Sequence, residues 1–237
     1  MYTYLLINIG IILFPLLLSF DKRVHYVSRW KYLFPSLFLV GIIFFLWDHY
    51  FTEWGIWGFN PAYLLGIYLW QLPLEEILFF VCVPFACLFI YEVVRYYNKR
   101  DVLQPVARPA TILLIGILFF VGLGNLHRTY TAVNFIALAM LLCVHLCFLK
   151  SGYLGHFYLA YLLSFIPFSV ANGILTNGLR FIDQGPVVWY NDLENLSLRI
   201  IGIPIEDFFY SMFLFLFNVT FYEHFKTKYS AREKLKK

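Results

Sequence analysis

The 237-residue chain is 61% hydrophobic and 22% aromatic, with 14% charged residues and a mean hydropathy of +0.72. These values exclude an ordinary soluble domain and indicate an integral membrane protein. The formal net charge of +4 does not require a nucleic-acid partner, because basic residues at the inner membrane surface are attracted to anionic membrane lipid.

Seven apolar runs are long enough to cross the roughly 30 Å hydrocarbon core as helices. They cover residues 3–20, 32–51, 74–94, 109–125, 131–149, 154–172 and 204–223. We therefore predict an all-α integral membrane protein with seven transmembrane helices. With the N-terminus outside, 15 of the 18 Lys and Arg residues fall in the inner segments, the exceptions being Arg128, Arg180 and Arg199. This bias predicts an outer N-terminus and a cytoplasmic C-terminus.

The chain is organised as two three-span units with one extra span between them. Residues 51–72, between the second and third runs, lack basic residues and are rich in Trp and Tyr, as is typical of a membrane interface. A polar linker with Pro105 and Pro109 follows the third run. We predict a first repeat at residues 1–99, a linker with the fourth span at 100–129, a second repeat at 130–226 and a basic cytoplasmic tail at 227–237. Because the extra span restores the orientation, the repeats are parallel.

The same acidic motif opens the last span of each repeat. Pro73-Leu74-Glu75-Glu76 opens the third run, and Pro204-Ile205-Glu206-Asp207 opens the seventh run 131 positions later. In parallel repeats both acidic pairs lie near the outer ends of their helices at the same depth. A pseudo-two-fold axis along the membrane normal would bring them across one cavity.

Carboxylates and proline also suit the first turn of any helix. Two observations favour chemistry: a carboxyl at the edge of an apolar segment is costly without a partner or a task, and both repeats carry the pair. Burial favours the neutral acid, so one carboxyl can act as a general acid while a better solvated one acts as a base. Adjacent helical residues point about 100° apart, so we expect one carboxyl of each pair to face the cavity and the other the loop.

Other candidate site residues flank the two motifs. Asn60 and Asn191 each precede the motif proline by 13 positions, where they would either orient a carboxyl or cap a loop. Aromatic rings in a membrane helix are ordinarily packing residues, but ring faces also stabilise a carbocation in a water-poor site. The aromatic candidates are Phe79, Phe80, Phe208, Phe209 and Tyr210.

The inner ends of the third and seventh runs carry a repeated charge pattern. Glu92 and Arg95, and likewise Glu223 and Lys226, are spaced for i, i+3 ion pairs on one helix face. These residues lie about 24 Å along the helix from the acidic motifs. We expect ion pairs at the inner surface without a catalytic part.

A Pro-x-Glu-(Glu/Asp) motif opening the last helix of each three-span unit resembles the heterodimeric-type lycopene cyclases of carotenoid biosynthesis, in their fused single-chain form. The resemblance covers essentially the whole chain. It implies a bacterial or archaeal membrane enzyme that cyclises lycopene or a related linear carotenoid, with other carotenoid-pathway enzymes as possible partners. In this reaction a proton adds to the terminal double bond, a ring closes, and a proton is lost.

The motif match makes Glu75 and Glu206 the first candidates for the essential carboxyls, with Glu76 and Asp207 next, and leaves open which is acid and which is base. Cyclisation is redox-neutral and the chain has no Gly-x-Gly-x-x-Gly loop between a strand and a helix. We therefore expect no dinucleotide or other cofactor. The cysteines and histidines show no metal-ligand spacing, so no metal site is predicted.

Two other classes of function fit parts of the pattern. A proton-coupled transporter or a hydrophobic-ligand-binding membrane protein also uses intramembrane acids and duplicated halves; equivalent helix breaks at mid-membrane would mark it, and Pro84 and Pro167 are not at equivalent positions. A membrane prenyl transferase would need paired Asp-rich boxes for magnesium. Only Asn191-Asp192-x-Glu194 approaches such a box.

Overall fold

The computed structural model describes residues 2–149, 151–177, 180 and 184–234, with side chains up to residue 231. Lys150, Asp183 and residues 235–237 of the predicted basic tail lie outside these ranges. The prediction of an all-α protein is confirmed, with a helix at each apolar run. The helices are α1 (Thr3–Leu18), α2 (Trp30–Glu53), α3 (Leu74–Tyr97), α4 (Gln104–Gly124), α5 (Thr129–Val144), α6 (Leu154–Leu175) and α7 (Ile205–Lys234).

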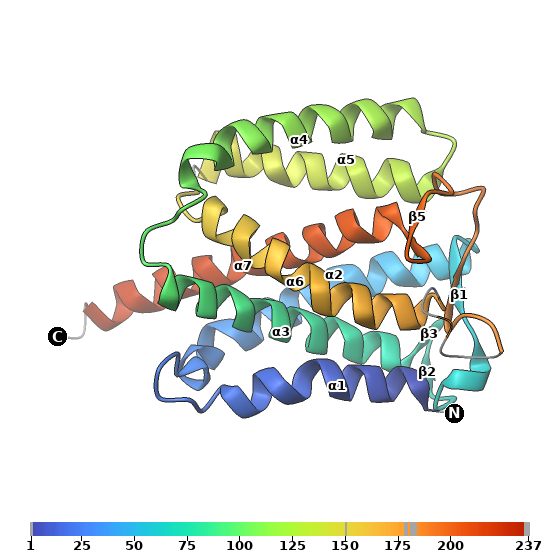
Figure 1. Ribbon diagram of the computed structural model, residues 1–237, viewed down its shortest axis with the longest axis horizontal. Coiled ribbons are helices and arrows are strands. Elements are labelled where there is room, and N and C mark those ends of the chain that lie inside the picture. Colours follow the sequence, from blue (N-terminus) through green and yellow to red (C-terminus); the bar gives the residue numbers. More distant parts are fainter. Residues whose placement is uncertain (1, 150, 178–179, 181–183, 235–237) are drawn as a thin grey trace.

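Short elements connect the helices. A 3-10 turn, Tyr26–Arg29, precedes α2, a second one spans Pro61–Tyr63, and a π-helical segment, His145–Leu149, extends α5. The described residues also form short strands of two or three residues each: β1 (Trp57–Phe59), β2 (Tyr68–Leu69), β3 (Leu72–Pro73), β4 (Val188–Tyr190), β5 (Arg199–Ile200) and β6 (Ile203–Pro204). All of them lie at the end of the bundle where the acidic motifs begin α3 and α7 (Figure 1).

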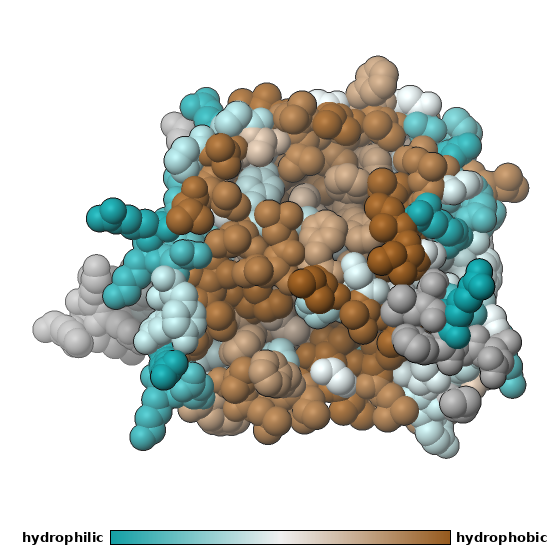
Figure 2. Space-filling model, in the orientation of Figure 1, coloured by the Kyte–Doolittle hydropathy of each residue, from teal (hydrophilic) through white to brown (hydrophobic). Residues whose placement is uncertain are grey.

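The helices run side by side, with the N-terminus at the strand-bearing end and the C-terminus at the other (Figure 1). Within the described residues, five helices are long and apolar enough to cross a membrane: those at Tyr26–Glu53, Leu74–Tyr97, Gln104–Gly124, Thr129–Leu149 and Leu154–Leu175. α1 is apolar but has only 16 residues, or about 24 Å of helix. Figure 2 shows an apolar belt across the middle of the visible face, with hydrophilic residues at its two ends.

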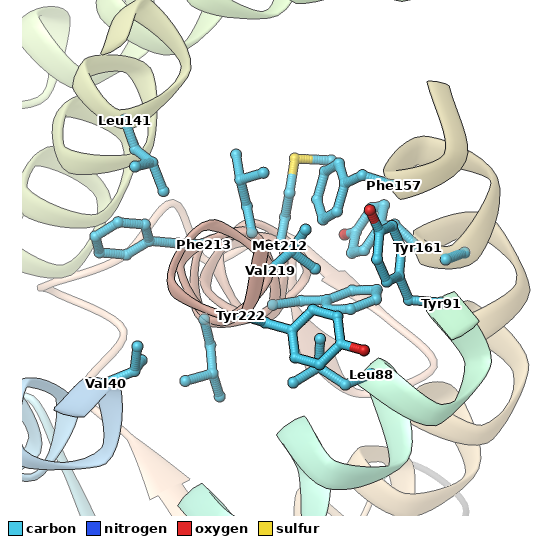
Figure 3. Close-up of a cluster of buried hydrophobic side chains, with 14 of the residues drawn as sticks. Val40, Leu88, Tyr91, Leu141, Phe157, Tyr161, Met212, Phe213, Val219 and Tyr222 are labelled. Atoms are coloured by element: carbon cyan, nitrogen blue, oxygen red, sulfur yellow. The ribbon is translucent and has the colours of Figure 1, made fainter. Parts of the chain in front are cut away.

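Helix α7 lies at the centre of the bundle. Its residues Met212, Phe213 and Val219 contribute to one continuous buried cluster. Figure 3 shows α7 surrounded by side chains from four other helices, Val40 of α2, Leu88 of α3, Leu141 of α5 and Phe157 of α6 among them. The second acidic motif therefore opens the helix that the rest of the protein encloses.

Packing between the helices repeats from one half of the chain to the other. α1 packs against α3 as α5 packs against α7, and α2 packs against α7 as α6 packs against α3, while α4 covers α5 and α6. Strands β1 and β4 pair antiparallel, with Gly58 opposite Trp189 at the centre and Trp57 opposite Tyr190. Trp57 and Val188 are 131 positions apart, so the strands are equivalent. Equivalent strands pair in this way when a two-fold axis passes between them.

The charged residues at the inner ends of α3 and α7 pair mainly across the two halves. The expected ion pair within α7, Glu223 with Lys226, is present, whereas Glu92 and Arg95 of α3 pair with residues of α7 instead of with each other. The Lys226 Nζ lies 2.8 Å from a Glu92 carboxyl oxygen and 3.8 Å from Glu223, and Arg95 pairs with Glu223. Glu92 also accepts a hydrogen bond from Tyr222 at 2.8 Å. These ion pairs form between the helices because α3 and α7 lie next to each other, so that the opposite helix offers a closer partner than the next turn of the same helix.

Candidate active site

Each acidic motif begins its helix directly after a hairpin. β2 pairs with β3 and β5 with β6, and the hairpin turns hold Trp70 and Ile201 at positive φ of 55° and 52°. Pro73 has extended backbone angles and caps α3, so that Glu75 and Glu76 fall in the first turn. In that turn the backbone N–H groups have no helical partners and the dipole favours negative charge.

The first carboxyl of each motif faces a loop. Leu65 N–H donates to Glu75 Oε1 at 2.6 Å, and Leu196 N–H donates to Glu206 Oε1 at 2.7 Å. Glu206 Oε1 also accepts from Thr131 Oγ1 at 2.6 Å. Both glutamates have 0% of their surface exposed. Their contacts hold the loop that precedes each hairpin.

The second carboxyl of each motif faces a cavity between the two halves. Glu76 and Asp207 line it together with Asp48 of α2. The cavity has a volume of about 60 Å³. Both motifs therefore contribute one carboxyl to a shared site, and a third buried acid joins them.

Tyrosines and an amide supply hydrogen bonds to these three carboxyls. Asp207 accepts from Tyr130 at 2.7 Å, from Tyr190 at 2.8 Å and from Asn172 Nδ2 at 2.7 Å. Tyr4 donates to Glu76 at 2.5 Å. Burial, and next the charge of Asp207, raise the pKa of Tyr190, so its phenol stays protonated and donates.

Asp48 bridges the two halves. It accepts a 2.6 Å hydrogen bond from Tyr210 of α7, and it lines the same small cavity as Glu76 of α3. Neighbouring carboxyls in a buried site do not both ionise readily, which favours a proton on one of the two. The site thus contains a pair of neighbouring acids, Asp48 and Glu76, together with Asp207 from the other half.

Aromatic rings surround the cavity. The ring centroid of Trp57 lies 5.0 Å from that of Tyr130, 6.2 Å from Tyr190 and 6.0 Å from Tyr210, and all four line the cavity. Phe79 lines it as well. Of the predicted aromatic candidates, Phe79 and Tyr210 thus reach the site. The other three are packed elsewhere: Phe80 against Phe44, Phe208 against Phe165 and Phe168, and Phe209 against Phe135.

The predicted asparagines contact loops. Asn60 Oδ1 accepts from Ala62 N–H at 3.1 Å, and its amide donates to the Gln184 carbonyl at 3.0 Å. Asn191 Oδ1 accepts from Leu193 N–H at 3.1 Å. These contacts match the loop-capping alternative, and no described contact joins either side chain to a motif carboxyl.

A larger apolar pocket adjoins the acidic cavity. It has a volume of about 370 Å³ and lies between α1, α3, α6 and α7. Both spaces are lined by Phe79, Val83, Phe168, Asn172, Ser211 and Leu214. At the other side the lining includes Gly10, Phe14 and Pro167, which are exposed. The acidic cavity therefore borders a largely apolar space whose other side lies at the apolar surface of the bundle.

The sequence model of the lycopene cyclase family matches residues 1–94 and 127–225 of the chain, one segment for each acidic motif. The chain belongs to the lycopene cyclase family. No match was found among curated proteins or among solved structures. Membership of this family indicates a carotenoid cyclase acting on a linear carotenoid.

The geometry of the site adds residues that the sequence analysis missed. Asp48 was detectable in principle, because it is an acid within an apolar run. Tyr4 and Asn8 recur as Tyr130 and Asn134, one helical turn apart in each case, and the two asparagines donate to the Glu75 and Glu206 carbonyls at 2.8 Å. That repeat has an offset of 126 positions, so a comparison at the fixed offset of 131 does not find it.

Proposed function

We propose that this protein is a membrane lycopene cyclase that converts the linear end group of a carotenoid into an ionone ring by proton-initiated cyclisation, without net redox change. The observation that carries the proposal is the junction of an apolar pocket with a cavity that contains three buried carboxyls. A polyene end group matches the first space, and an acid and a base match the second.

The substrate enters laterally from the bilayer. Gly10 and Phe14 of α1 and Pro167 of α6 are exposed at the mouth of the apolar pocket, on the hydrophobic surface of the bundle. A carotenoid dissolved in lipid therefore keeps an apolar environment along the whole route. The part of the polyene that does not react remains in the pocket or in the membrane.

The reaction takes place among the aromatic rings of the cavity. After protonation the end group carries a positive charge, and the faces of Trp57, Tyr130 and Tyr210 attract a cation. Exclusion of water protects this cation from capture. The carboxyls supply and remove the proton, so the reaction needs neither a dinucleotide nor a metal.

The two repeats share the same reaction site. Glu76 of the first repeat and Asp207 of the second line the same space, so two motif copies form one reaction site. A substrate with two linear ends is then cyclised one end at a time, and a monocyclic carotenoid is released or turned round between the two reactions.

We also propose that all seven helices cross the membrane, with the N-terminus outside. In this arrangement α1 contributes to the pocket mouth at the depth of the hydrocarbon core. The shortness of α1 is accommodated by local thinning of the bilayer or by interfacial flanking residues.

Expression in a bacterium that accumulates lycopene tests the function. Chromatography of the pigments should show monocyclic products first and bicyclic products later. Accumulation of unchanged lycopene, with the protein present in the membrane fraction, would contradict the proposal.

A further inference from the structure

We infer that Asp48 and Glu76 together form the acid that donates the proton, and that Asp207 is the base that accepts it. This inference rests on the proposed cyclisation. It assigns a catalytic part to Asp48, which lies outside both acidic motifs.

The two halves of the site differ at several corresponding positions, and one of these differences places a carboxyl in one half and an amide in the other. In the first half the second motif carboxyl, Glu76, shares the small cavity with Asp48 of α2. In the second half the corresponding carboxyl, Asp207, meets Asn172 of α6, whose amide lies 2.7 Å away. Helices α2 and α6 occupy corresponding places, since α2 packs on α7 and α6 on α3. A carboxyl in one half is thus matched by an amide in the other.

This difference determines where a proton is held. Asp48 and Glu76 lie in one cavity of about 60 Å³, where Tyr210 donates to Asp48 and Tyr4 donates to Glu76. Two neighbouring carboxyls do not both ionise readily in a buried site. The pair therefore carries a proton into the reaction.

Asp207 accepts more of the described hydrogen bonds than either Asp48 or Glu76. It accepts three hydrogen bonds, from Tyr130, Asn172 and Tyr190. Hydrogen bonds donated to the charged form stabilise that form. The Asn172 amide cannot give up a proton to the substrate, so in this half the site contains an acceptor without an acid.

The proposed steps balance without a further reactant. A proton leaves the Asp48–Glu76 pair, and the π electrons of the terminal double bond form the new C–H bond. The π electrons of a second double bond then form the ring C–C bond, which moves the cation into the ring. A neighbouring C–H bond breaks, its electrons form the ring double bond, and its proton goes to Asp207. Return of that proton to the pair restores the site, and the product is an isomer of the substrate.

The test compares Asp48→Asn, Asp207→Asn and wild type, each purified in lipid and supplied with lycopene. Asp48→Asn should slow the consumption of lycopene by at least about 100-fold, as expected for loss of a general acid. In Asp207→Asn the substrate cation should still form, but it should lose a proton from a different carbon or capture water. The products would be ring double-bond isomers or a hydrated ring. In deuterated water the wild-type ring should gain one deuterium at the carbon protonated first.

The double variant Asp48→Asn with Asn172→Asp is the sharpest control, because it moves the carboxyl pair to the other half. It should consume lycopene at least about tenfold faster than Asp48→Asn, corresponding to about 1.4 kcal/mol in the barrier. Asp48→Glu should also keep a large part of the rate. If folded Asp48→Asn cyclises at the wild-type rate, the acid assignment is wrong while the cyclase function stands. If wild type forms no ring, the proposed function itself fails.

Discussion

Substitution of the two neighbouring carboxyls of the second motif should separate a structural role from a chemical one. Glu206→Ala removes the acceptor of the hydrogen bonds from Leu196 N–H and Thr131 Oγ1, at 2.7 and 2.6 Å. Each buried donor left unsatisfied costs about 1–3 kcal/mol. The variant should therefore lose about 2–6 kcal/mol of unfolding free energy, a large fraction of the roughly 5–15 kcal/mol typical of a folded protein.

Glu206→Gln should behave very differently. The amide keeps an oxygen at the position of Oε1, so both donors retain their acceptor. The other carboxyl oxygen, Oε2, has no hydrogen-bond partner among the described residues, and the amide nitrogen replaces one unpartnered atom with another. The loss of stability should thus stay near about 1 kcal/mol, and cyclisation should continue at close to the wild-type rate. Asp207→Asn should retain the fold yet reduce correct product by at least about 100-fold.

Thermal unfolding of the purified variants in detergent measures the loss of stability, and chromatography of lycopene conversion in lipid measures the rate of cyclisation. Glu75→Gln is the matched control, since Glu75 Oε1 accepts from Leu65 N–H in the equivalent place. Complete loss of cyclisation in Glu206→Gln, with an unchanged unfolding temperature, would show that the first motif carboxyl takes part in the chemistry and would refute this reasoning.

Three further predictions follow from the fold and the pocket. Gly10→Trp should slow conversion about tenfold or more, because the indole would narrow the pocket mouth, while a side chain there meets nothing within 4 Å that would disturb the fold. Gly116→Trp on α4 is equally unobstructed and should leave the rate unchanged. Equal slowing by both variants would contradict lateral entry. Purified protein should convert lycopene without added flavin or NAD(P)H and show no flavin absorbance, so a strict requirement for reduced flavin would exclude the carboxyl mechanism. Reporters in the Asn98–Arg108 region and after Lys237 should be cytoplasmic, and tags beside Trp57 and Trp189 should be outside; labelling of the last two on opposite sides would overturn the parallel arrangement.

The apolar runs predicted the helices well, because burial in lipid requires a continuous hydrophobic stretch. Their ends were less accurate, since hydropathy marks the membrane boundary and not the end of a helix. α7 was predicted to end at residue 223 but continues to Lys234, because no Gly or Pro interrupts residues 224–234. α4 begins at Gln104 rather than at residue 109, since Pro105 is compatible with the first helical turn.

The sequence indicated the two acidic pairs and the division of each pair between a cavity and a loop. It could not show which member faced which way, because this depends on the path of the preceding loop, where Leu65 and Leu196 present their N–H groups to the first carboxyl. The tyrosines that donate to the carboxyls could not be predicted from the sequence either. Tyr190 and Tyr130 lie 17 and 77 positions from Asp207, and only the packing of β4 and α5 brings them together.

Asp48 shows why an internal duplication is an incomplete guide to a shared site. Residues that serve the same purpose in both halves are retained twice, as Glu75 and Glu206 are for the two loops. A reaction that first donates a proton and then accepts one needs unlike groups on its two sides, and these cannot be found by searching for equal residues. The contrast between Asp48 and Asn172 supplies such a difference while the surrounding helices keep their symmetric packing. In a duplicated enzyme with one central cavity, the positions where the repeats disagree are therefore the places to look for the direction of proton transfer.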